Sequence, residues 1–278
     1  PPPGKRGTFL GTGFGCVDTT WEYLEGMLRD GAATANPFLF AESVANAPAG
    51  HSAIELDTRG ADITLTCGDA SAAAALEMAA RAIRDGRLEM ACCGGVELAP
   101  EPLVRILASL RSPLFLGEGG ACLVLESLDL ARSRGARIYG EVAGGALASD
   151  PEAPATGYSR DPGALERILR RALASAGRGS RLPGEAIRKI FLHAAGSPRA
   201  DAAERRAVER TCPGVPTETV AAKAGALAAA GGLNLVAAAL EAGDPAGGTP
   251  GAPLLPVNAF GWGGSLVSVV FRKAEALE

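Results

Sequence analysis

Long apolar runs and a surplus of charge of either sign are both missing from this chain of 278 residues. No stretch of about 18 apolar residues runs without a glycine or a charge, so no candidate for a membrane-spanning helix is present. The formal net charge of −4 gives no support for nucleic acid or an anionic membrane as a partner. No signal-peptide pattern is found either, and we expect a cytoplasmic protein without these partners.

Cysteine is also sparse, with six residues and no spacing typical of a disulfide framework. Several cysteines lie inside strand-like runs, which favours reduced, buried thiols and fits the expected cytoplasmic location. Cys92 and Cys93 are adjacent and do not form a Cys-x-x-Cys pair. We therefore expect no metal site.

Apolar residues, in contrast, make up 47% of the chain, which fits an α/β protein with buried helices. A folded chain of this size buries about 75% of its unfolded surface, so an extensive core is available. The length allows either one large domain or two fused halves.

The stretch Gly60–Glu97 shows the pattern that organises the chain. Ile63–Thr66 is a β-branched run typical of a strand, and Asp69 or Ser71 then offers a side-chain oxygen to the free amides of a helix start. Ala70–Arg84 is rich in alanine, and such small side chains predict a helix buried in the middle of the protein. Enzymes use a helix start of this kind for a nucleophile or an oxyanion site, because its amides and dipole stabilise negative charge.

Later segments continue this alternation of strand and helix. Met90–Cys93 predicts a second buried strand, which the following pair of glycines should end. Ala226–Glu241 is a second alanine-rich helix behind a short strand, about 155 residues after the first. This faint repeat predicts two related halves, which we place at residues 1–135 and 136–278.

The segment before the central stretch predicts helices. Thr19–Arg29 has the periodicity of an amphipathic helix, with Trp21 and Leu24 on its apolar face. Ala41–Leu56 is weakly helical and contains His51. We interpret His51 as a structural residue of this segment and not as a catalytic one.

These motifs resemble those of the β-ketoacyl synthase family, a member of the thiolase-like superfamily. That family carries a strand, then Thr-Ala-Cys-x-Ser-Gly, then a helix ending Ala-Ala-Arg-x-Ile, and then Ala-Gly-Gly-Ala-Glu. The matching anchors here are Arg59–Gly60, Ala79–Arg81 and Gly94–Glu97. The resemblance implies a thiolase-like α/β fold of two related halves, with central mixed sheets and buried Ala-rich helices layered α-β-α-β-α. The first half is truncated relative to the family and lacks its first strand, which would leave a sheet edge uncovered.

Aligned without gaps on these anchors, Asp69 falls at the position of the family's catalytic Cys. A carboxylate cannot form the thioester that condensation needs, but it can cap the helix, where the dipole and amides should keep it ionised. We therefore interpret Asp69 as a structural cap or charge mimic, with a catalytic acid as the lesser alternative. Cys67 is an alternative nucleophile, but it requires a two-residue slip and lacks the helix amides that lower a thiol pKa.

The other site positions implied by the resemblance are changed in part. The first family His is retained as His193, whereas the two Thr that hold the pantetheine arm become Ala195 and Ser197. Ala226 falls where the family has its second His, and Ala221 where it has a Lys.

The closing glycine-rich motif of the family is present as Asn258–Gly264. The resemblance places this loop beside the acyl site, with Phe260 and Trp262 as residues that contact substrate. Both aromatic side chains could equally be packing residues.

The resemblance therefore implies a degenerate, non-catalytic subunit of the chain-length-factor type. It would pair as a heterodimer with an active ketosynthase in polyketide or fatty acid elongation. It would need no cofactor, and the acyl-phosphopantetheine arm of an acyl carrier protein would be its substrate. Two alternatives stay open: a residual acyltransferase or decarboxylase that uses His193 with Asp69 or Cys67, and a homodimeric scaffold protein without catalysis.

Overall fold

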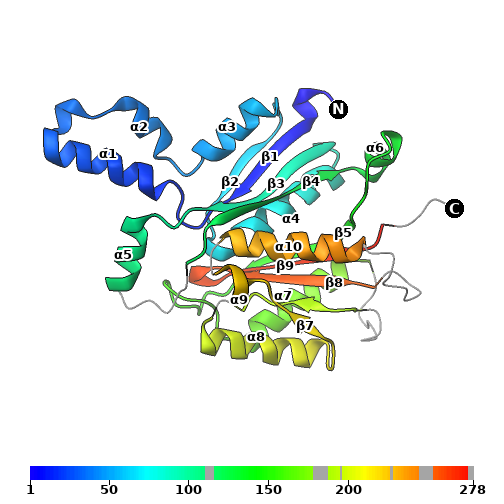
Figure 1. Cartoon of the computed structure of the whole chain (residues 1–278). Helices are drawn as coiled ribbons and strands as arrows, with labels where there is room; N and C mark the ends of the chain where they lie inside the picture. Colours follow the sequence, from blue (N-terminus) through cyan, green and yellow to red (C-terminus); the bar gives the residue numbers. More distant parts are fainter. Residues whose placement is uncertain (110–115, 178–186, 195, 226–227, 244–252, 275–278) are drawn as a thin grey trace.

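Two sheets with helices between and outside them make up the protein, seen here in a computed structural model (Figure 1). The structure describes residues 1–109, 116–177, 187–194, 196–225, 228–243 and 253–274. In this part of the chain, no helix combines the length and the hydropathy that crossing a membrane would require.

The first sheet has four strands in the order β2-β1-β3-β4. β1 runs parallel to both β2 and β3, and β4 runs antiparallel to β3. The strands are β1 (Arg6–Gly11), β2 (Asp62–Leu65), β3 (Met90–Glu97) and β4 (Gly119–Glu126).

β3 continues through Gly94 and Gly95, so the prediction that these glycines end the strand is wrong. A Cβ atom on Gly94 would lie 2.0 Å from the carbonyl oxygen of Ala121 in β4. Glycine at this position lets two backbones approach closely inside a sheet, which the dipeptide alone does not distinguish from a chain break.

The second sheet has five strands in the order β5-β9-β8-β6-β7. β6 is parallel to β7 and β8, and β9 is antiparallel to both β8 and β5. The strands are β5 (Glu141–Ser149), β6 (Ile190–Phe191), β7 (Thr217–Glu218), β8 (Leu255–Phe260) and β9 (Ser265–Arg272).

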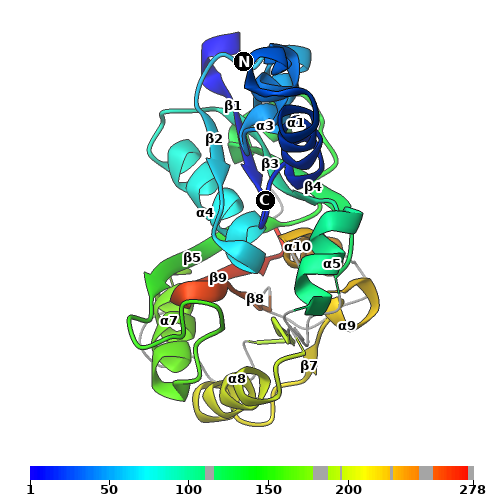
Figure 2. The same cartoon turned by 90° about the vertical axis from the view of Figure 1, so that its left-hand side faces the viewer.

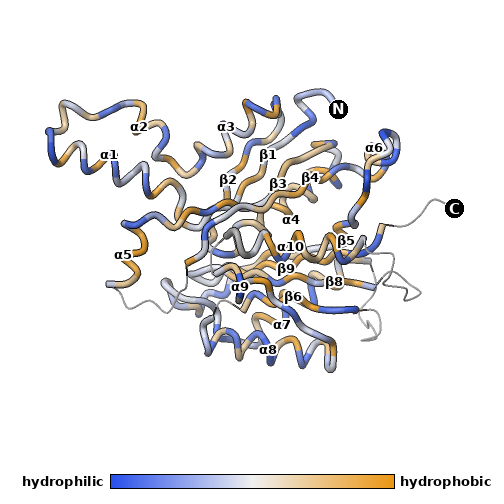
Figure 3. Tube along the Cα trace, in the orientation of Figure 1, coloured by the Kyte–Doolittle hydropathy of each residue, from blue (hydrophilic) through white to orange (hydrophobic). Residues whose placement is uncertain are grey.

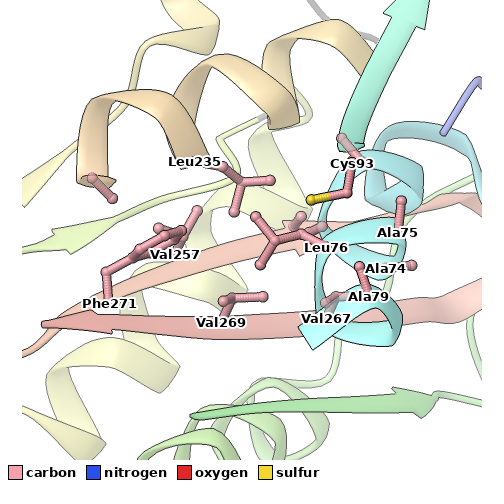
Figure 4. Close-up of a cluster of buried hydrophobic side chains, with 14 of the residues drawn as sticks. Ala74, Ala75, Leu76, Ala79, Cys93, Leu235, Val257, Val267, Val269 and Phe271 are labelled. Atoms are coloured by element: carbon pink, nitrogen blue, oxygen red, sulfur yellow. The ribbon is translucent and has the colours of Figure 1, made fainter. Parts of the chain in front are cut away.

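The two Ala-rich helices, α4 (Ser71–Arg84) and α10 (Ala228–Ala242), lie between the sheets and contact both. In α4 the alanines are buried, as predicted. Leu76 of α4 and Leu235 of α10 meet above Val269 of β9 in a shared core (Figure 4). Because the helices contribute mostly alanine to this core, they pack closely against both sheets.

The remaining helices form the outer layers (Figure 1). α7 (Pro162–Ser175) covers β5 and β9, α8 (Pro198–Thr211) packs on α7, and α3 (Ala47–Glu55) lies against β1 and β2. The expected α-β-α-β-α layering is therefore present. The shorter elements are η1 (Pro3–Lys5), η2 (Ala32–Thr34), α2 (Pro37–Glu42), η3 (Gly68–Ala70), α5 (Glu101–Ser109), α6 (Leu128–Ser133), α9 (Ala221–Ala224) and η5 (Trp262–Gly264).

Helix α1 (Val17–Asp30) projects away from the sheets together with α2 (Figures 1 and 2). The helix predicted at Thr19–Arg29 is present, but none of its residues is buried, and Leu28 is 88% exposed. Figure 3 shows apolar and polar residues alternating along these projecting helices. Their apolar faces are covered only in part: the rings of Tyr23 in α1 and Phe40 in α2 pack on each other at 5.8 Å, while Leu28 and Phe38 stay exposed.

Candidate functional site

Asp69 lies in η3, directly before α4, and is only 3% exposed. Its carboxylate accepts a hydrogen bond from the hydroxyl of Tyr158, with 2.5 Å between Oη and Oδ2. It does not cap the helix, because its side chain turns toward Tyr158 instead of back toward the amides of α4. The side-chain oxygen at this turn that accepts from a backbone amide is Oγ of Ser71, which bonds N of Cys67 at 2.8 Å.

Burial dominates the ionisation of Asp69. Desolvation raises its pKa to about 6, although the hydrogen bond from Tyr158 acts in the opposite direction and the charge of Glu97 adds a smaller increase. Burial thus outweighs the helix start, but a pKa of about 6 still leaves the carboxyl mostly ionised at pH 7, and its ionised state stays a prediction. Burial also raises the pKa of Tyr158, and the negative charge of Asp69 raises it further, so the phenol stays a hydrogen-bond donor.

His193 follows β6 and is buried beside Asp69. The distance between its Nε2 and Oδ2 of Asp69 is 3.8 Å, which is too long for a hydrogen bond, and Nε2 has no hydrogen-bond partner among the described residues. Burial lowers the pKa of His193 to about 3. The imidazole is therefore neutral, and its contact with Asp69 is not an ion pair.

Aromatic rings fix the orientation of His193. The ring of Tyr158 lies edge-on to the imidazole at a centroid distance of 5.1 Å, and the ring of Phe260 does the same at 5.5 Å. Trp262 contributes a hydrogen bond to the Tyr158 hydroxyl and packs edge-on against Phe14 at 5.3 Å. The two aromatic residues singled out in the glycine-rich motif thus both contact the cluster around His193.

Glu204 of α8 holds the backbone behind His193. Its carboxylate accepts from N of His193 at 3.0 Å, from N of Ala194 at 3.1 Å and from Nδ2 of Asn258 at 3.0 Å. Ala194 has a positive φ of 42°, a strained conformation that these bonds help to maintain. Burial raises the pKa of Glu204 to about 7.

Sequence reasoning missed Tyr158 and Glu204. Tyr158 lies in a loop rich in proline and glycine, and Glu204 on a highly charged helix, so neither local pattern predicts burial. Asn258 was noted only as part of a motif. Its partners on α8 and β9 depend on tertiary structure.

The other predicted site residues are placed less centrally. Cys67 is half-buried, and burial raises the pKa of its thiol more than the bond from Ser71 lowers it. Ser197 is half-buried at the start of α8 and makes no capping bond. Ala226 and Ala195 lie outside the described residues.

His51 is exposed on α3 and bonds Glu42 through Nε2 at 2.8 Å. It borders a hollow of about 200 Å³ that also includes Cys16, Asp18 and Glu97. His51 is therefore exposed and is not part of the buried cluster of Asp69, Tyr158 and His193. Its structural interpretation stays a prediction.

Comparison with known proteins gives the class of this layered protein. Residues 3–131 match the β-ketoacyl synthase N-terminal domain, and residues 139–243 match the β-ketoacyl synthase C-terminal domain. The chain belongs to the β-ketoacyl synthase family, which confirms the resemblance seen in its motifs.

Two curated relatives illustrate the range of similarity. The chain is 28% identical over 315 residues to 3-oxoacyl-[acyl-carrier-protein] synthase 2 of Synechocystis sp., and the match covers 96% of this chain and 74% of the relative. It is 43% identical over 129 residues to the actinorhodin polyketide putative β-ketoacyl synthase 2 of Streptomyces coelicolor, over 45% of this chain and 30% of that protein.

A solved structure, the ishigamide ketosynthase/chain length factor, matches with a TM-score of 0.84 and 23% sequence identity. The match covers 98% of this chain and 76% of the other. At this identity the likeness shows the fold alone, and it confirms the predicted thiolase-like α/β fold. The exact division of the chain at residue 135 stays a prediction.

Proposed function

We propose that this chain is a non-catalytic ketosynthase-like subunit that works beside an active β-ketoacyl synthase. The observation that carries the proposal is the bonded pair of Asp69 and Tyr158 at the start of α4, where the family resemblance places a nucleophilic thiol. A carboxylate there forms no stable thioester with an acyl chain. The hydroxyl of Tyr158 also donates its hydrogen bond to Oδ2 of Asp69, the carboxylate oxygen that lies 3.8 Å from Nε2 of His193.

The geometry favours shape over chemistry. His193 is 6% exposed and neutral, and its free Nε2 is surrounded by Tyr158 and Phe260 instead of a nucleophile. Asp69 and His193, the two groups that could act as a general acid–base pair, are thus both buried. In this proposal the chain contributes a packed surface that shapes and stabilises its partner, with no bond-making of its own.

The substrate and partners follow from the relatives. The Synechocystis relative is named as an acyl-carrier-protein synthase, and the ishigamide structure combines a ketosynthase with a chain length factor. We therefore propose a heterodimer with an active ketosynthase, acting on an acyl chain carried by the phosphopantetheine arm of an acyl carrier protein. Ser197, half-buried before α8, is the residue proposed to lie nearest to that arm.

The residual-enzyme alternative has weaker support. It would need Cys67 or Asp69 to act with His193, but the pKa of the Cys67 thiol is raised, and no group in the described part of the chain hydrogen-bonds Nε2 of His193. A neutral thiol is a poor nucleophile. The homodimeric scaffold differs from the proposed subunit in its binding partner, a second copy of the chain, and the geometry of the site does not separate the two.

The test is co-expression of the chain with an active ketosynthase and an acyl carrier protein. We expect a 1:1 complex on gel filtration with light scattering. After incubation with an acyl- or malonyl-thioester, mass spectrometry should find the acyl adduct on the ketosynthase and none on Asp69, Cys67 or His193 of this chain. An adduct on any of these residues would refute the non-catalytic role.

Asp69→Asn provides the matched variant, because it keeps the shape of the side chain and removes its charge. Elongation by the complex should stay within about twofold of the unmodified complex, since no step uses this carboxylate. A loss of turnover with an intact complex would favour the residual enzyme. A chain that forms only homodimers under these conditions would favour the scaffold protein.

A further inference from the structure

Two cysteines lie on one face of the first sheet, on neighbouring strands. Cys92 of β3 is opposite Val124 of β4. Cys122 of β4 is opposite Gly94 of β3. Because residues two apart on a strand share a face, Cys92 and Cys122 are diagonal neighbours on one side of the sheet.

Gly94 brings the two thiols into contact. It has no side chain, so the position directly across from Cys122 leaves room for the Cys122 side chain to lean toward Cys92. β3 and β4 also approach closely here, since a Cβ atom on Gly94 would lie 2.7 Å from Cα of Cys122. The thiol of Cys92 donates a hydrogen bond to the sulfur of Cys122, which lowers the pKa of Cys122 and raises that of Cys92.

Solvent reaches this pair from the side of Cys122. Cys122 is exposed, Cys92 is half-buried, and the neighbouring Val124 is 62% exposed. Cys93, the next residue along β3, points to the opposite face and into the core near Leu235 (Figure 4). An accessible thiol with thiolate character beside a second thiol is the arrangement that reversible thiol oxidation requires.

The same positions of the second sheet are buried. β7-β6-β8-β9 repeats the order of β2-β1-β3-β4, and a Gly-x-Gly-Gly motif precedes the last strand of each. On this correspondence Leu266 takes the place of Cys122, and Asn258 takes the place of Cys92. Leu266 and Asn258 are 1% and 3% exposed, and α7 packs over these strands. The thiol pair thus lies where the first sheet meets solvent, and core packing does not account for it.

We propose that Cys92 and Cys122 form a redox-active dithiol, which a hydroperoxide converts into a disulfide between β3 and β4. The Cys122 thiolate attacks the peroxide, so that an S–O bond forms, the O–O bond breaks and the leaving oxygen takes a proton. The sulfur of Cys92 then attacks the sulfenic acid at Cys122, so that the S–S bond forms and water leaves. The two thiols lose two electrons in total, and the hydroperoxide is reduced to an alcohol and water, or to two waters if it is hydrogen peroxide.

The geometry also predicts that the disulfide is easily reduced. Diagonal neighbours in a sheet are farther apart than directly opposite residues, so a bond between them holds the two strands under strain. Strained and exposed disulfides are the labile ones, and structural disulfides are not. The inference goes beyond the proposed function, because it uses no residue of the buried site around Asp69 and His193.

The first experiment treats the folded full chain with hydrogen peroxide, blocks the remaining thiols and maps tryptic peptides without reduction. We expect Leu88–Arg105 to be linked to the peptide that contains Cys122, with fragment ions assigning the bond to Cys92 and not to Cys93. The link should form at least about tenfold faster than Cys16 or Cys67 loses its free thiol, since burial raises the pKa of both. An excess of reduced glutathione should restore both thiols.

Matched variants separate the roles of the two sulfurs. Cys93→Ala should keep the link, and Cys122→Ser should abolish it. In Cys92→Ala the sulfenic acid at Cys122 has no second thiol to react with, so dimedone should label Cys122 strongly in this variant and only weakly in the unmodified chain.

Three results would each overturn the proposal. The first is oxidation of Cys122 to sulfinic or sulfonic acid while Cys92 stays reduced. The second is a link that joins two chains or includes Cys93. The third is equal dimedone labelling of Cys122 in Cys92→Ala and in the unmodified chain, which would show that Cys92 does not take part.

Discussion

The two sheets of this protein share a strand order but differ in enclosure. The second sheet places its antiparallel strand β9 between two strands and beneath a helix, whereas in the first sheet no strand of the described residues pairs with one edge of the equivalent strand β4. The side chains follow the enclosure, because Leu266 is buried at a position where the first half has the exposed residue Cys122. Burial in this fold is therefore a property of what covers a strand and not of its place in the sheet order.

Matched truncations on the two equivalent strands should give the largest difference in the free energy of unfolding. We expect Leu266→Ala to lower the free energy of unfolding by about 2–5 kcal/mol, because it opens a cavity under α7. Val124→Ala should change it by no more than about 0.5 kcal/mol, since the side chain already meets solvent. Urea unfolding of both variants measures the difference, and similar losses would contradict the contrast between the sheets.

A second matched pair tests the close approach inside the open sheet. Gly94→Ala should cost about 1–3 kcal/mol, because the new methyl group would meet the backbone of β4 at Ala121. Gly120→Ala, at the second residue of β4, has free space and should cost less than about 1 kcal/mol. Thermal unfolding of the unmodified chain and of both variants measures the two losses of stability. A destabilisation by Gly120→Ala as large as that by Gly94→Ala would show that β4 is covered.

The buried site between the halves should reveal itself in the pH dependence of stability. The pKa of His193 is depressed to about 3, so between that value and its ordinary 6.5 the unfolded chain binds a proton that the folded chain does not. Stability due to this residue is therefore lost as pH falls below about 6.5. Against His193→Gln, the unmodified chain should lose up to about 1.4 kcal/mol per pH unit in this range.

Two carboxyl groups act in the opposite direction. The pKa values of Asp69 and Glu204 are raised to about 6 and about 7, so their contribution to stability is present at low pH and is lost as pH rises through those values. Both groups are present in the unmodified chain and in His193→Gln, so the difference between the two isolates the histidine. Tyr158→Phe keeps His193 and should retain the slope. A flat difference from pH 6.5 to 4.5 would mean that His193 is not buried as a neutral group.

Much of the fold was predictable because it depends on local composition. The alanine content of α4 predicts its burial, and the strand–helix alternation predicts the layers, because a helix of such small residues stabilises itself only between other elements. The extent of β3 was not predictable, since whether Gly94 ends a strand depends on the partner that approaches it. The exposure of α1 was not predictable for a related reason, because its periodicity shows an apolar face but not what would cover that face.

The candidate site was predictable only in its outline. The aligned motifs predicted that Asp69 and His193 belong to one site. The hydrogen bond from Tyr158 to Asp69 was not predictable, because it joins residues 89 positions apart. The direction of the pKa shift of Asp69 could not be predicted from a helix start alone, because burial outweighs the helix amides and raises the pKa. Glu204 gives no signal in the sequence, since its acceptor role depends on the backbone amides of His193 and Ala194.

The smallest expected effect on stability, and the sharpest probe of enclosure, comes from Cys122. A hydrogen bond with Cys92 lowers the pKa of its thiol, whereas burial raises the pKa of Cys93 on the same sheet. Cys122 should therefore react first with iodoacetamide at pH 7.5, because it is exposed and its pKa is lowered. Cys122→Ser should abolish this fast phase and change the free energy of unfolding by no more than about 0.5 kcal/mol. Peptide mapping of the alkylated chain checks the order of reaction, and a Cys122 that reacts as slowly as Cys93 would show that β4 is enclosed like β9.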